Sequence, residues 1–206
     1  MSDGGTGSRR RLPELVQRHL TDLYALDDQP PVGEFLHYRS GAGRERLLLR
    51  HGEDDVLEMT LELPREAMAP SGPLRLDTTC QVVEGVSHFV LVADRARREL
   101  STTQLELELQ AEIDKFVILA LSPGRPLEPH ELSRLHGRLF QAVRFVHRAD
   151  SEDGERYRIA NRLGARFARH LDRDYLSRAR FAELLEALRR FYRAGPTAKI
   201  AMAEAA

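Results

Sequence analysis

The feature that most constrains this chain of 206 residues is an apolar stretch that carries two ionisable side chains. Residues 80–93 are rich in valine, yet Glu84 and His88 stand among them, four residues apart. An ionisable group inside an apolar segment costs free energy to bury unless it has a partner. We therefore expect any specialised role of this protein to involve this segment.

The conformation of residues 80–93 decides how these two side chains are placed. Val83, Val86 and Val90 recur at helical spacing, which predicts a helix from about residue 77 to residue 99. The competing interpretation is a β-hairpin that turns at residues 84–85, because β-branched residues are dense here. The helix is preferred, since residues 77–79 supply N-cap candidates and a polar segment continues the pattern to residue 99.

The rest of the chain shows two kinds of periodicity. Residues 12–27 have helical spacing, whereas residues 33–63 change to alternation, seen best where Leu57, Met59 and Leu61 are separated by polar residues. This pattern predicts a three-stranded antiparallel β-meander. Helical spacing returns in residues 103–121, 129–148, 155–172 and 177–194. The expected fold class is therefore α+β: a predominantly helical bundle of about five helices, with an N-terminal helix and the small meander.

These segments suggest a division of the chain into four parts. Residues 1–11 contain Gly, Ser and Arg and are expected to form a disordered lead. Residues 12–73 hold the N-terminal helix and the meander, and residues 74–195 hold the helical bundle. Residues 196–206 form a C-terminal tail, expected to be frayed or to dock as a short segment.

Composition limits the compartment in which the protein acts. Cys80 is the single cysteine, so no intrachain disulfide can form. The N-terminal residues contain no apolar stretch of the secretory type, and the longest apolar run, residues 89–93, is far shorter than the ~20 residues of a membrane span. We expect a cytoplasmic protein without a membrane partner.

Charge is unevenly distributed along the chain. Residues 125–206 contain 17 Lys and Arg against 11 Asp and Glu, whereas the remainder contains 14 against 21. Such asymmetry is typical of a nucleic-acid-binding face, or of a surface that packs on an oppositely charged neighbour or on a second copy. Lys115 and Lys199 are the only lysines, so nearly every basic position is arginine.

Glu84 and His88 are the first candidates for chemistry. On a helix they share one face and fit a general base with its orienting partner, although a structural pair is the more common outcome. If helices 77–99 and 103–121 form a hairpin, Glu112 approaches His88 and completes an acid–base or metal-binding cluster. Glu108 and Glu112 are each placed to pair locally, Glu112 with Lys115, and the acidic face of residues 105–116 is otherwise expected to be solvated. No nucleophile, nucleotide or Cys/His metal motif is present, so we expect no metal and no cofactor.

A basic stripe is the second candidate. Five arginines recur at spacings of three and four residues and line one helical face: Arg158, Arg162, Arg166, Arg169 and Arg173. With Arg189, Arg190 and Arg193 they are suited to bind phosphates, although three acids interrupt the pattern. The expected function is a non-catalytic cytoplasmic protein-interaction or scaffolding module, with a protein partner or self-association. The alternatives are nucleic-acid binding through the Arg158–Arg173 face, and an enzyme that uses Glu84, His88 and Glu112.

Overall fold

The computed structural model describes residues 12–40, 43–51, 57–67, 75–121, 124–125 and 127–206. The chain divides into two compact units, one made of Met1–Asp22 and Leu26–Ser101, the other of Leu23–Ala25 and Thr102–Ala206. The predicted disordered lead, residues 1–11, lies outside the described residues. The division at residue 73 stays a prediction about which parts fold together.

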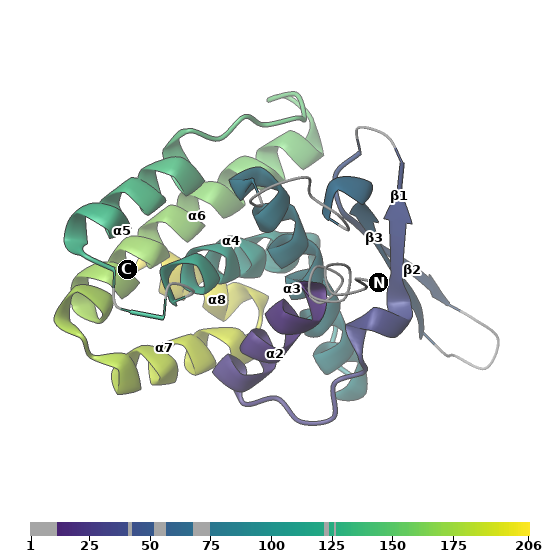
Figure 1. Ribbon diagram of the computed structural model, residues 1–206, viewed down its shortest axis with the longest axis horizontal. Helices are drawn as coiled ribbons and strands as arrows, with labels where there is room; N and C mark the ends of the chain where they lie inside the picture. Colours follow the sequence, from purple (N-terminus) through teal and green to yellow (C-terminus); the bar gives the residue numbers. More distant parts are fainter. Residues whose placement is uncertain (1–11, 41–42, 52–56, 68–74, 122–123, 126) are drawn as a thin grey trace, which may run out of the picture. The chain divides into compact units, whose positions relative to one another are not determined.

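The first unit combines a small sheet with helices (Figure 1). Its elements are α2 (Leu12–Tyr24, whose last two residues cluster with the second unit), η1 (Val32–Phe35), β1 (Leu36–Arg39), β2 (Arg46–His51), β3 (Leu57–Pro64), η3 (Arg65–Ala67) and α3 (Leu76–Arg97). The helix predicted for residues 12–27 is thus present and ends at Tyr24.

The sheet is mixed, and the predicted antiparallel meander is wrong. Its strand order is β1-β3-β2, with β2 antiparallel and β1 parallel to the central strand β3. A meander would place β1 beside β2, whereas here β3 lies between them. Periodicity shows which face of a strand is apolar and does not show which strand lies beside it.

Residues 80–93 are helical, which confirms the preferred interpretation over the hairpin. The 22-residue helix α3 packs on the sheet through Gly85. A Cβ atom added there would lie 2.9 Å from Leu61 and 3.2 Å from Leu63. A side chain at this position would therefore force the Leu61 side chain to shift. Burial of the valines outweighs their preference for strands.

The second unit is helical. Its elements are α4 (Gln104–Leu121), α5 (Pro129–His136), the π-helical turn η4 (Gly137–Gln141), α6 (Glu152–Asp174), η5 (Leu176–Arg178), α7 (Phe181–Arg193) and α8 (Pro196–Glu204). Figure 1 shows α4 at the centre of this unit, with α5, α6, α7 and α8 around it. The described residues thus contain seven α-helices, and the additional one, α8, comes from the tail that was expected to fray or dock.

The helix predicted for residues 129–148 is shorter than expected. It continues from α5 into η4 and ends at Gln141. The side-chain amide of Asn161 donates a hydrogen bond of 3.1 Å to the carbonyl oxygen of Phe140, which satisfies one of the last acceptors of this helix. Val146, which lies beyond this end, is 72% exposed.

Candidate functional site

The helix α4 carries a row of buried polar side chains. Glu106, Gln110 and Asp114 follow one another at intervals of four residues and are 2%, 0% and 1% exposed. Because residues four apart share a helical face, the three form a continuous polar row. The prediction that the acidic face of residues 105–116 is solvated is wrong for Glu106 and Asp114, and Glu108 is buried as well.

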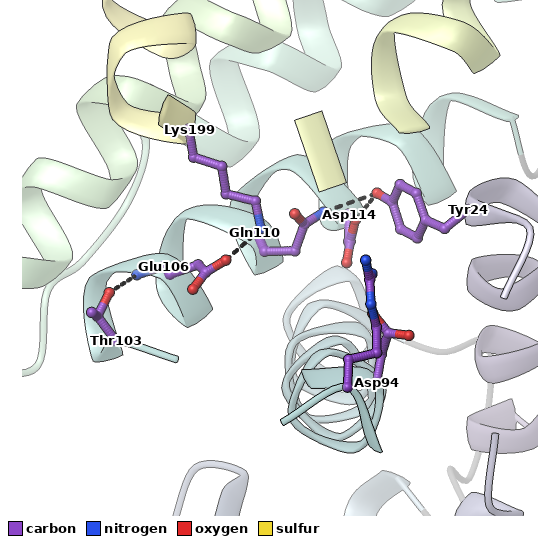
Figure 2. Close-up of polar contacts among 8 residues, drawn as sticks. Tyr24, Asp94, Thr103, Glu106, Gln110, Asp114 and Lys199 are labelled. Atoms are coloured by element: carbon purple, nitrogen blue, oxygen red, sulfur yellow. Dashed lines mark hydrogen bonds and ion pairs between the residues drawn. The ribbon is translucent and has the colours of Figure 1, made fainter. Parts of the chain in front are cut away.

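The first member of this row is paired with a lysine from the C-terminal helix. The ammonium of Lys199 on α8 donates to Oε1 of Glu106 at 3.0 Å, and both side chains are completely buried (Figure 2). The Lys199 nitrogen also lies 5.7 Å and 5.5 Å from the ring centres of Phe191 and Tyr192, at distances typical of cation–π contacts. A buried charge needs such compensation, and here it receives an anion and two aromatic rings.

The other end of the row holds a tyrosine. The hydroxyl of Tyr24 donates to Oδ1 of Asp114, and the amide of Gln110 donates to the same carboxylate at 2.9 Å and to the tyrosine hydroxyl at 3.0 Å (Figure 2). Burial raises the pKa of Tyr24, and the Asp114 carboxylate raises it further. The phenol therefore stays protonated and acts as a donor to Asp114. Its ring stacks on Tyr192 at 4.2 Å.

The geometry of this network indicates what it does chemically. Glu106 is bound to Lys199, Asp114 to Tyr24, and Gln110 bridges to Asp114. Lys199 has 0% exposure, so its amine does not reach a molecule in solvent. The row connects α4 to α8 and to Tyr24, so its role is to stabilise the packing of the second unit.

A second polar cluster lies in the first unit around Glu84. Nη2 of Arg44 lies 3.4 Å from Oε2 of Glu84, and Nε of Arg44 lies 3.7 Å from Oε2 of Glu45. Burial raises the pKa of Glu45 to about 9, with a smaller contribution from the negative charge of Glu84 and an opposing one from Arg44. At neutral pH Glu45 is protonated, and it shares a hydrogen bond with Glu84. The sequence analysis missed Glu45, since nothing in its local pattern marks a buried acid.

The predicted site residues are placed as follows. Glu84 and His88 both lie on α3 and are 2% and 9% exposed. Glu112 belongs to the other unit, where it accepts a hydrogen bond of 3.0 Å from Lys115 and its Cβ atom faces Gly164 of α6. Assembly of Glu84, His88 and Glu112 stays a prediction. In the described part of the chain, no group of three or more His, Cys, Asp and Glu side chains is arranged to hold a metal ion.

The arginine stripe, defined as Arg158, Arg162, Arg166, Arg169 and Arg173, lies on α6 as predicted. Its members are exposed or half-buried, while the opposite side of the helix is buried through Ala160, Leu163, Gly164, Phe167, Ala168 and Leu171. The helix begins after Ser151, whose hydroxyl accepts a hydrogen bond of 3.1 Å from the Gly154 amide.

The five arginines differ in what they contact. Arg158 donates to the Gly154 carbonyl oxygen at 2.7 Å, Arg166 donates to the Glu204 carbonyl oxygen, and Arg173 pairs with Asp174 at 2.8 Å. Within the described residues, Arg162 and Arg169 make neither a hydrogen bond nor an ion pair, and both are exposed. The predicted patch partners lie on α7, where Arg189 donates to the Leu23 carbonyl oxygen at 2.9 Å.

Comparison of the chain with protein-family models, with curated proteins and with solved structures finds no match. Among the helices of the described segments, none has the length and apolar character needed to cross a membrane.

Proposed function

We propose that this protein is a non-catalytic interaction module that binds an acidic protein partner through the arginine stripe of α6. The observation that carries the proposal is the exposure of Arg162 and Arg169, which make no ion pair with an acid among the described residues. Guanidinium groups offer forked donors that match carboxylates, so two of them on one face are suited to an anionic surface. The single cysteine supports placing this activity in the cytoplasm.

The state of the other charged groups supports the same proposal. Four ionisable side chains of α4 have polar partners: Glu106 pairs with Lys199, Glu112 with Lys115, and Asp114 with Tyr24. Groups held in this way stabilise the bundle and have no open position toward a substrate. The outward arginines of α6 are the charged groups best placed to meet another molecule.

The experiment compares two double variants in affinity capture from the native extract, after nuclease treatment, with quantitative mass spectrometry. R162A/R169A removes two positive charges from the stripe, and R134A/R138A removes two exposed charges from α5 and η4 as the matched control. We expect one or more acidic proteins to be retained by the wild type and by R134A/R138A but lost with R162A/R169A. Equal recovery of the same proteins by all three forms would contradict the proposal.

Nucleic acid is the second candidate, because the five arginines follow one face of α6 as a continuous row. Arginine binds phosphate in the same forked manner as carboxylate, and phosphate contacts make affinity strongly dependent on salt. Fluorescence anisotropy with a labelled 20-nucleotide single strand, and with its duplex, tests this candidate between 50 and 200 mM NaCl. Binding that weakens steeply with salt and is lost in R162A/R169A favours it, whereas no binding at 50 mM salt excludes it.

A further inference from the structure

An apolar patch adjoins the N-terminal end of the arginine stripe. Phe145 is 36% exposed and Val146 is 72% exposed, and both lie in the segment between η4 and α6. The Arg158 guanidinium lies 4.6 Å from the centre of the Phe145 ring, which connects this patch to the first arginine of the stripe. Positive charge and exposed apolar surface therefore lie side by side at one end of α6.

We propose that the partner binds with an acidic helix that places one apolar side chain on Phe145 and Val146 and two carboxylates on Arg162 and Arg169. This inference rests on the proposed function and specifies the chemistry of the partner at that same surface. A protein helix fits this surface both in the spacing of its side chains and in its chemistry.

The spacing follows from helix geometry. Arg162 and Arg169 are seven residues apart on α6, which corresponds to about 10.5 Å along the axis. Two carboxylates on a partner helix match this separation at positions i and i+7, whereas an extended chain presents same-face side chains about 6.6 or 13 Å apart. Arg158 precedes Arg162 by one turn, so the apolar side chain of the partner belongs four residues from the nearer carboxylate.

The surface chemistry favours a peptide over a nucleic acid. Val146 is the more exposed member of the patch, and an aliphatic side chain offers a base no aromatic face for stacking. The rings of His147 and Tyr157 stack on each other, with their centres 5.2 Å apart and an interplanar angle of 5°. The patch is suited to bury an apolar side chain, while the arginines bind carboxylates at its margin.

The test uses four labelled probes and measures dissociation constants by fluorescence anisotropy in 100 mM NaCl. The first probe is a helical 20-residue peptide with one Leu, a Glu four residues later and a second Glu seven residues after that, on an Ala/Gln background. The second replaces the Leu with Ser, the third replaces both Glu with Gln, and the fourth is a 20-nucleotide single strand. The proteins are the wild type, V146S, R162A/R169A and the control R134A/R138A.

We expect the first peptide to bind the wild type at least threefold more tightly than either altered peptide. The apolar contact and the ion pairs are each partly exposed to solvent, so each contributes only modestly to affinity. V146S should weaken binding of the first peptide about threefold and leave binding of the Ser peptide unchanged, and R134A/R138A should behave as the wild type. If R162A/R169A weakens binding but V146S and the Leu-to-Ser change do not, the proposed function survives and the helix inference is overturned. Tighter binding of the nucleotide strand, or equal binding of the peptides to all four proteins, overturns both. If the wild type without probe has the mass of a dimer and V146S has the mass of a monomer, a second copy of the chain covers this surface. That result would overturn the inference.

Discussion

Folding clearly changes the protonation of the Glu45 side chain. Its carboxyl group lies beside Glu84 and Arg44 with a side chain 5% exposed, and its pKa is raised from 4.5 to about 9. Two neighbouring carboxylates in a buried site cannot both ionise at low cost, so one of them keeps its proton. His88 lies one turn further along α3 and is itself buried.

This arrangement predicts a pH dependence of stability. Between pH 4.5 and about 9, the folded chain keeps a proton on Glu45 that the unfolded chain releases. The contribution of this group is therefore fully present below pH 4.5, declines as the pH rises, and is lost above about pH 9. We expect E45Q, whose amide stays neutral, to flatten the fall in the free energy of unfolding measured by urea titration at pH 5, 7 and 9. E58Q, at an exposed position of β3, serves as the control, and a wild-type slope in E45Q would contradict the prediction.

The buried pair of Lys199 and Glu106 predicts a second result. K199M leaves the Glu106 carboxylate buried without its cation, which typically costs about 3–5 kcal/mol. The double variant E106Q/K199M removes the charge as well and should recover a large part of this loss. Urea unfolding of the wild type, both single variants and the double variant gives the coupling energy. Additive effects of the two changes would show that the pair contributes no coupling to the fold.

For the buried ion pairs of α4, the sequence did contain an indication. An arginine-rich chain with two lysines indicates that something distinguishes those two positions, and both lysines form ion pairs with glutamates of α4. Glu45 gave no comparable signal, because its partner Glu84 lies far away in the sequence.

Among the helices, the contact between α4 and α6 depends on a glycine. A Cβ atom added at Gly164 would lie 2.7 Å from the Cβ atom of Glu112 and 3.4 Å from the Phe140 ring. Since the Cβ atom of Glu112 is fixed to the α4 backbone, the two helices must separate to relieve the clash. This close approach explains a glycine in the middle of a long helix, where it otherwise lowers stability by about 1 kcal/mol.

We therefore expect G164A to lower the free energy of unfolding by about 1–2 kcal/mol, the overpacking cost less the gain in helix propensity. G137A is the matched control, because an added Cβ there meets only a Gln141 oxygen at 3.7 Å and the backbone has helical angles. It should raise stability by about 0.5 kcal/mol. Thermal unfolding followed by circular dichroism checks both, and a stabilising G164A would show that α4 and α6 separate without cost.

At the scale of elements, the sequence predicted most helices and failed where contacts between segments decide the outcome. α3, α4 and α6 follow from the spacing of their apolar residues. The end of η4 depends on Asn161, which lies 21 residues away from the carbonyl that it caps. The parallel pairing of β1 with β3 joins residues 25 positions apart in the sequence, such as Leu36 and Leu61. Patterns within a segment do not contain either piece of information.

For the molecule as a whole, the uneven charge has a measurable consequence. Residues 125–206 hold 17 basic and 11 acidic side chains, the rest of the chain holds 14 and 21, and the net charge is −1. With little net repulsion, copies attract through opposite charges at low ionic strength. We expect the mean mass from sedimentation velocity at pH 7 to exceed 23.4 kDa in 20 mM NaCl and to approach it in 300 mM NaCl, because salt screens these charges within about 10 Å at 0.1 M. Association that does not respond to salt would show that apolar surface holds the copies together.

The placement of both lysine side chains inside the helical unit gives a direct way to observe its opening. Lys115 and Lys199 are 8% and 0% exposed, so a lysine-specific protease or an acylating reagent reaches them only when the surrounding helices separate. Cleavage after these two positions, followed over time in the native protein, should proceed at the rate set by that opening. In K199M only the cut after Lys115 remains. The increase in its rate relative to the wild type measures how strongly α8 stabilises the packed state of the unit.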